Sequence, residues 1–160
     1  MSWTELDFGK HKGLTLPQVL FKDPDWFFWA VSNDALKTRP RLKSEAIELN
    51  EKARRIKVPQ SGRDTLVVEY WIHRPTHKFS HFDLVPESRP HHVGSSSAHR
   101  SKVIDLSFPR RIAPYDKLGC KSMLSSLKHY LFGSKSARMT KQRCEDFFDE
   151  SRNFVRIAAI

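Results

Sequence analysis

Residues 7–31, DFGKHKGLTLPQVLFKDPDWFFWAV, decide how the chain begins to fold. These 25 positions hold two glycines, three lysines, a histidine, four phenylalanines and two tryptophans. Gly9 and Gly13 predict a turn, because glycine accepts positive φ angles. Thr15 and Asp23, each closely followed by a proline, predict the N-caps of two short helices. The stretch therefore predicts a short strand, a turn and two helices.

The aromatic residues of the second predicted helix allow two interpretations. Exposed rings stack on nucleic-acid bases, whereas buried rings form a core. A unit of about thirty residues needs large apolar side chains for its core, so we interpret four adjacent rings as mainly core: Trp26, Phe27, Phe28 and Trp29. Lys10 and Lys12 in the turn are then candidates for binding a phosphate. The alternative is a corner whose lysines are only solvated.

This N-terminal stretch resembles the small domain found at the C-terminal end of exodeoxyribonuclease X-like proteins and in short bacterial and phage proteins. The resemblance covers about residues 5–36. It rests on FGKHKG at residues 8–13, Leu16 and Val19 in the first helix, and Pro24 and Trp29 in the second. Trp26 and Phe27 stand where that family has Tyr and Leu. The resemblance implies an accessory module of nucleic-acid metabolism and does not imply an active site.

The next segments predict a boundary and a change of structure. Ser44 predicts the N-cap of a third helix that runs to about Ile56. The polar loop Pro59–Asp64 is the best boundary, so we expect an N-terminal helical unit at residues 1–58 and an α+β unit at residues 64–160.

The hydrophobic period then changes to that of strands. Residues 65–74 and 79–86 are rich in β-branched and aromatic residues and predict a β-hairpin. Residues 102–109 predict a third strand, whereas the Gly-, Ser-, Pro- and His-rich residues 86–101 predict a mobile loop.

Two C-terminal helices complete the predicted fold, with Asp116 and Thr140 as their N-caps. We therefore expect the α+β class. In chain order it has an N-terminal strand–turn–helix–helix unit, a helix, a small antiparallel β-meander and two C-terminal helices.

Positive charge is the strongest global signal. The 160 residues carry 28 Lys and Arg against 18 Asp and Glu, a net charge of +10 and a pI near 9.9. Residues 37–63 hold nine basic and three acidic side chains, and residues 64–143 hold 14 basic and six acidic ones. Such a balance favours a polyanionic partner, although a basic but merely well-solvated protein is the alternative. The candidate phosphate contacts are Lys10, Lys12, Arg54, Arg55, Lys57, Arg63, Arg110 and Arg111.

The histidines offer a second chemistry. His73, His77 and His81 recur every four residues in the predicted hairpin, where His73 and His81 could approach each other beside Asp83. A metal-dependent nuclease would use such a group. Because no HExxH or comparable spacing is present, we interpret these histidines as ordinary polar residues of the hairpin.

No cofactor or metal site is expected from the motifs. Cys120 and Cys144 are not spaced as CxxC, and they predict reduced, buried thiols. Neither a nucleophile elbow nor a dinucleotide fingerprint is present. We also find no apolar run long enough to span a bilayer and no secretory signal. A cytoplasmic location is therefore the expectation.

These observations predict a non-enzymatic nucleic-acid-binding accessory protein of bacterial or phage origin. It would bind phosphates through its central basic segments, and DNA and RNA remain equally open. The alternative is a phage-encoded protein that binds and inhibits or redirects an acidic host protein, because a basic surface suits that partner too.

Overall fold

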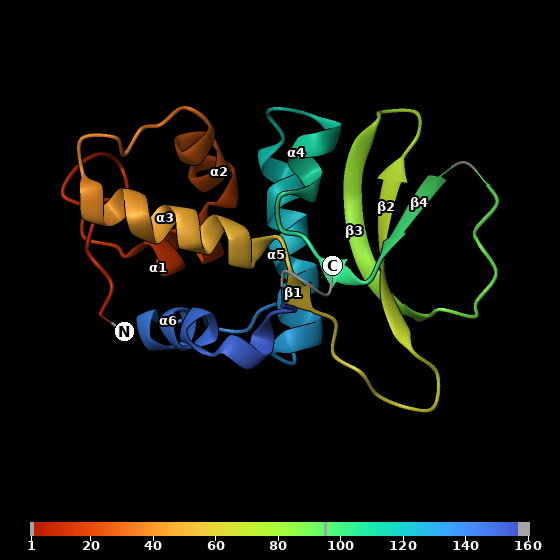
Figure 1. The fold of residues 1–160 in the computed structure, drawn as a ribbon. Coiled ribbons are helices and arrows are strands. Elements are labelled where there is room, and N and C mark those ends of the chain that lie inside the picture. Colours follow the sequence, from red (N-terminus) through yellow and green to blue (C-terminus); the bar gives the residue numbers. More distant parts are fainter. Residues whose placement is uncertain (1, 95, 157–160) are drawn as a thin grey trace.

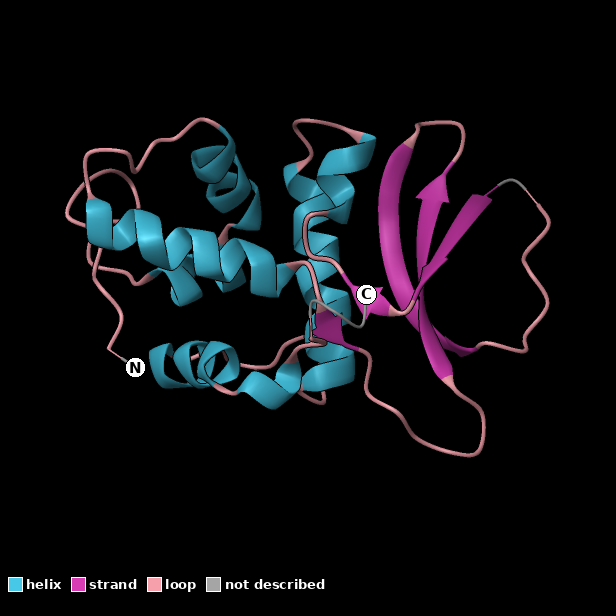
Figure 2. Cartoon of the chain, viewed as in Figure 1, coloured by secondary structure: helices cyan, strands magenta, loops and turns pink. Residues whose placement is uncertain are grey.

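Most helices gather on one side of the molecule, and the larger sheet lies on the other (Figure 1, Figure 2). The computed structural model describes residues 2–94 and 96–156. Its helices are α1 (Leu16–Lys22), α2 (Pro24–Ser32), α3 (Pro40–Ala53), α4 (Phe108–Ile112), α5 (Lys117–Leu131), α6 (Lys141–Asp149) and the 3-10 helix η1 (Ser151–Asn153). Its strands are β1 (Ile56–Lys57), β2 (Leu66–His73), β3 (Lys78–Pro86), β4 (Ser96–Ser101) and β5 (Val103–Ile104). The predicted α+β class is confirmed.

The N-terminal turn folds as its glycines predict. Gly9 and Gly13 have φ angles of +72° and +88°, and Glu5 forms a β-bridge with Thr15 across the turn. The Asp23 carboxylate accepts a hydrogen bond from the Trp26 N–H at 3.3 Å, which caps α2 as predicted. Thr15 is likewise the N-cap of α1, where its N–H donates to the Gln18 side chain at 3.0 Å.

The aromatic residues of α2 divide between core and surface. Phe27 and Phe28 are fully buried, and Trp26 is partly buried. Trp29 is 38% exposed. The core interpretation is confirmed for the two phenylalanines and is wrong for Trp29, because neighbouring positions on a helix face different directions.

Helix α3 begins earlier than expected. Pro40 occupies its first position, where the missing N–H costs nothing. Ser44, the predicted cap, lies inside the helix, and the helix ends at Ala53 rather than near Ile56. Ile56 instead forms β1, which pairs antiparallel with β5. The pairing of β1 with β5 therefore places the end of α3 beside the strands.

The three-stranded sheet has the order β3-β2-β4 and is antiparallel throughout. The β2–β3 hairpin is confirmed. The ladder pairs Ile72 with Phe79 but Trp71 with His81, which leaves Ser80 as an extra, bulged residue. The bulge turns both Phe79 and Phe82 toward the core, although simple alternation would place them on opposite faces.

The segment expected to be a mobile loop contains a strand. Residues 96–101 form β4, which pairs with β2 from Val68 to His73. The polar composition did not predict a strand here. An edge strand can be polar because its backbone pairing with the neighbouring strand requires little apolar burial. The predicted strand at residues 102–109 shrinks to the two residues of β5, and α4 follows it.

A single hydrophobic cluster joins the helical and sheet halves, with members from Trp3 to Phe154. Helix α5 packs against β3 and against α2, and Figure 1 shows it between the sheet and the N-terminal helices. Asp116 and Thr140 cap α5 and α6 as predicted. Within the described ranges, no helix combines the length and the apolar character needed to cross a bilayer.

Candidate nucleic-acid interface

A cleft of about 610 Å³ opens where the end of α3, the strands β2, β4 and β5, and the helix α4 meet. We call it the arginine cleft. Its lining residues are Glu51, Arg54, Arg55, Tyr70, His99, Arg100, Ser101, Val103, Asp105, Phe108 and Arg111. Three of the eight predicted phosphate contacts therefore meet here, although they come from two segments more than fifty residues apart in sequence.

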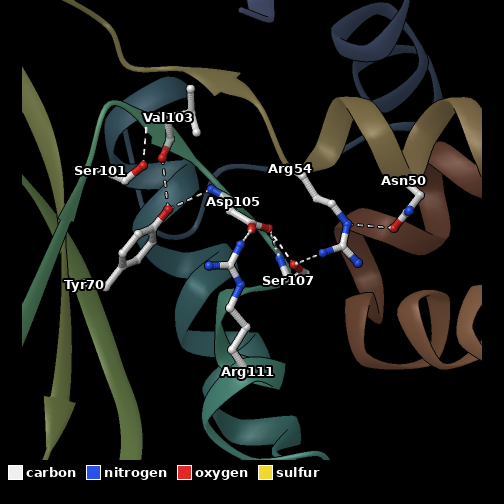
Figure 3. A network of polar contacts seen from close by, with 8 residues as sticks. All are labelled: Asn50, Arg54, Tyr70, Ser101, Val103, Asp105, Ser107 and Arg111. Carbon is white, nitrogen blue, oxygen red and sulfur yellow. Dashed lines mark hydrogen bonds and ion pairs between the residues drawn. The ribbon is translucent and has the colours of Figure 1, made fainter. Parts of the chain in front are cut away.

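A buried carboxylate organises the floor of the cleft (Figure 3). Asp105 is only 5% exposed. It accepts hydrogen bonds from the Ser107 N–H at 2.8 Å and the Ser107 hydroxyl at 2.6 Å, and it forms an ion pair with Arg111. Because a buried carboxylate is costly unless it is paired and hydrogen-bonded, these contacts make Asp105 a structural anchor of the cleft.

Tyr70 holds the backbone of that floor in place. Its hydroxyl accepts a hydrogen bond from the Asp105 N–H at 2.8 Å and donates one to the Val103 carbonyl at 3.1 Å. Burial raises the pKa of Tyr70 well above its usual value, so the phenol remains a donor at any ordinary pH. Strand β2 is thereby tied to the segment that leads into α4.

Arg54 is the exposed cation at the cleft rim. Its guanidinium donates to the Asn50 side chain at 3.1 Å and to the Ser107 hydroxyl at 2.9 Å. Ser107 in turn donates to Asp105. The side chain is therefore oriented by neutral partners, and no carboxylate of the described residues pairs with its guanidinium.

Arg55 is held more deeply. It donates to the Val155 carbonyl at 2.6 Å, and Val155 donates its N–H to the Arg55 carbonyl at 2.9 Å. Its Nε is buried and has no hydrogen-bond partner among the described residues.

Arg100 adds little net positive charge to the cleft, because a carboxylate balances it. Its guanidinium pairs with Glu69 at 2.9 Å. Glu69 and Arg100 are ladder partners, as are the adjacent residues Tyr70 and His99. Since neighbouring residues on a strand point to opposite faces, the Glu69–Arg100 pair and the Tyr70–His99 pair lie on opposite faces of the sheet. Arg100 nevertheless borders the cleft, but Glu69 balances its charge.

Rings form the wall beneath the sheet. Tyr70 stacks on Phe108 with centroids 4.0 Å apart and an interplanar angle of 10°. The exposed His99 ring lies 6.1 Å from the Phe108 ring. The cleft therefore combines guanidinium groups with an exposed imidazole that is backed by two buried rings, and such groups can contact the phosphate and the base of a nucleotide.

The N-terminal turn uses its polar groups internally. The N–H groups of Lys12, Gly13 and Leu14 donate to carbonyls of the same hairpin turn. Lys10 pairs with Asp23 at 3.0 Å, and the buried His11 also contacts Asp23 at 3.0 Å. The turn is thus fastened to the start of α2.

That contact also perturbs the Asp23 carboxyl. Burial acts to raise the pKa of Asp23, but the hydrogen bonds from Lys10 and His11 outweigh it and hold the pKa below the usual value. Lys12 remains exposed at the surface. A phosphate site at this turn stays a prediction.

The other predicted contacts lie outside the arginine cleft. Arg110 pairs with the buried Asp25 of α2 at 2.5 Å, whereas its neighbour Arg111 turns into the cleft. Lys57 is exposed on β1, and Arg63 is exposed in the loop after it. Sequence reasoning treated Arg110 and Arg111 alike, but one helical step separates their directions by about 100°.

The histidines of the hairpin are engaged locally. His73 contacts the Thr76 hydroxyl at 2.8 Å. His81 lies 3.4 Å from Asp83 and stacks near Trp71. Within the described part of the chain, no group of three or more His, Cys, Asp or Glu side chains is arranged to hold a metal ion.

Eight of the eleven lining residues were not predicted from the sequence, and Tyr70, His99 and Asp105 are the most important of them. Tyr70 was predicted only as a strand residue. His99 lay in the expected loop, and Asp105 lay in the expected third strand. The spacing Asp105-x-Ser107 was the available signal, because an Asp side chain commonly accepts from the backbone two residues later.

The chain gave no match to known family models, to curated proteins or to solved structures. The resemblance of the N-terminal segment therefore stays a prediction. A function can be inferred only from the geometry of the arginine cleft.

Proposed function

We propose that this chain is a non-enzymatic nucleic-acid-binding protein that holds phosphates in the arginine cleft. The main support for this proposal is that Arg54, Arg55 and Arg111 line one concave site. Guanidinium groups suit phosphate because they present several donors in a fixed plane. A cytoplasmic location and a bacterial or phage origin belong to the same proposal.

The electrostatics of the whole chain support this proposal. A net charge of +10 attracts a polyanion from a distance. Binding then releases counterions from the nucleic acid, which makes affinity fall steeply as salt rises. The cleft supplies the short-range contacts that general attraction lacks.

The test compares two exposed cations of one short segment. Fluorescence anisotropy of labelled DNA and RNA would be titrated with the wild type, Arg54→Ala and Lys57→Ala at several salt concentrations. Both variants lose one positive charge, but only Arg54 lines the cleft. We expect Arg54→Ala to weaken binding roughly tenfold, the loss of one charge-assisted hydrogen bond, and Lys57→Ala to weaken it much less.

Equal losses in the two variants would show that only the overall charge attracts nucleic acid. Absence of binding at low salt would refute the proposal and favour an acidic protein as the partner. That partner would be sought by co-purification after nuclease treatment.

A further inference from the structure

The shape of the arginine cleft restricts which nucleic acid it takes. Proteins that read a duplex insert a helix or a β-ribbon into its groove. Here the charged residues line a hollow of about 610 Å³, a volume within the roughly 300–1,000 Å³ range of small-ligand sites. A hollow of this size receives one nucleotide that projects into it, and base pairing would prevent a duplex from offering one.

The two walls of the cleft differ in chemistry. Arg54 and Arg55 stand on the side formed by the end of α3. On the sheet side, the exposed His99 ring lies beside Phe108, which is itself stacked on Tyr70. The first wall suits a phosphate, and the second offers the exposed His99 imidazole, backed by the buried Phe108 and Tyr70 rings, to a base.

The charge balance of the cleft matches one phosphodiester. Arg111 is paired with Asp105, and Arg100 with Glu69. The lining charges that remain are those of Arg54 and Arg55 against Glu51. This leaves an excess of one positive charge, which a single phosphodiester would neutralise.

We propose that the arginine cleft receives one nucleotide of a single strand, with its phosphate at Arg54 and Arg55 and its base against His99. This inference rests on the proposed function and adds the class of nucleic acid. Duplexes would bind only through the general charge of the surface.

The experiment uses the full chain and three labelled ligands of equal length: a single strand, the matching duplex, and a chain of abasic sites that keeps every phosphate. Affinities would be measured by anisotropy for the wild type, for His99→Ala and for His91→Ala. His91 is an exposed histidine outside the cleft, and it serves as the control.

We expect the single strand to bind at least tenfold more tightly than the duplex. The abasic chain should bind roughly fivefold or more weakly than the single strand, the loss expected for one stacked base. His99→Ala should remove that difference, because it weakens only the binding of the base-bearing strand. His91→Ala should leave all three affinities unchanged.

Equal binding of duplex and single strand, or of abasic and normal strands, would overturn the inference and leave phosphate binding intact. A loss of discrimination in His91→Ala equal to that in His99→Ala would also overturn it. Failure of the proposed function looks different, because no ligand would then bind at low salt, or Arg54→Ala would bind every ligand as the wild type does.

Discussion

At the scale of single residues, adjacent arginines have opposite roles. Arg110 points to α2, where it pairs with Asp25 at 2.5 Å and also donates to the Asp25 carbonyl at 3.2 Å. Both side chains of this pair are largely shielded from water, with 17% and 10% exposure. Arg54, by contrast, is exposed and has no carboxylate partner among the described residues. One arginine therefore holds the fold, and the other remains free for a ligand.

The contrast between the two arginines can be measured. Arg110→Ala should lower the free energy of unfolding by about 3 kcal/mol, because it leaves a buried carboxylate without its cation. Arg54→Ala should change that free energy by less than about 1 kcal/mol, as surface substitutions usually do. Urea unfolding of the two variants measures both values. A stable Arg110→Ala protein with impaired nucleic-acid binding would instead make Arg110 a phosphate contact.

At the scale of elements, helix α2 shows how a run of aromatic residues is divided. Phe28 is 1% exposed and Trp29 is 38% exposed, although they are adjacent. The run WFFW predicts a covered helix, but a helix packed on one side still leaves one direction to solvent. The bulge at Ser80 makes the same point for a strand, since it places Phe79 and Phe82 on one face.

Substitutions in α2 test this division. Phe28→Ala should cost about 3–5 kcal/mol of unfolding free energy, because it opens a cavity in the core. Trp29→Ala should cost roughly 1–2 kcal/mol, since water already reaches much of the ring and no closed cavity forms. Thermal and urea unfolding would compare the two. Equal losses of unfolding free energy in the two variants would mean that another molecule or segment covers Trp29 in solution.

At the scale of the whole molecule, one core connects the parts that the loop Pro59–Asp64 separates in sequence. The Trp3 indole donates to Asp149 at 3.1 Å, and α1 packs against α6. Ile56 forms bridges with both Ile104 and Phe154. The predicted units at residues 1–58 and 64–160 thus share their buried surface, and we expect them to unfold together.

The two cysteines report on this cooperativity. Cys120 in α5 and Cys144 in α6 are both buried, and burial raises the pKa of each thiol to about 12. Near pH 8, iodoacetamide should therefore modify them only after unfolding. For each cysteine, mass spectrometry of the peptides would give the rate of modification in the folded protein and in the unfolded chain. The folded-to-unfolded ratio of these rates should be similar for the two cysteines. Much faster modification of Cys144 would show that α6 opens separately.

Local sequence was sufficient for the α+β class, the helix caps at Asp23, Asp116 and Thr140, the hairpin and the positive charge. The caps and the hairpin depend on neighbours within a few residues, so short-range patterns record them, and the charge follows from composition alone. Long-range packing decided which cations share a site. The pairing of β4 with β2 and of β5 with β1 brings His99 and Asp105 beside the end of α3. Arg110 and Arg111 each turn toward a different buried carboxylate, Asp25 and Asp105, and the local pattern of two adjacent arginines does not encode that.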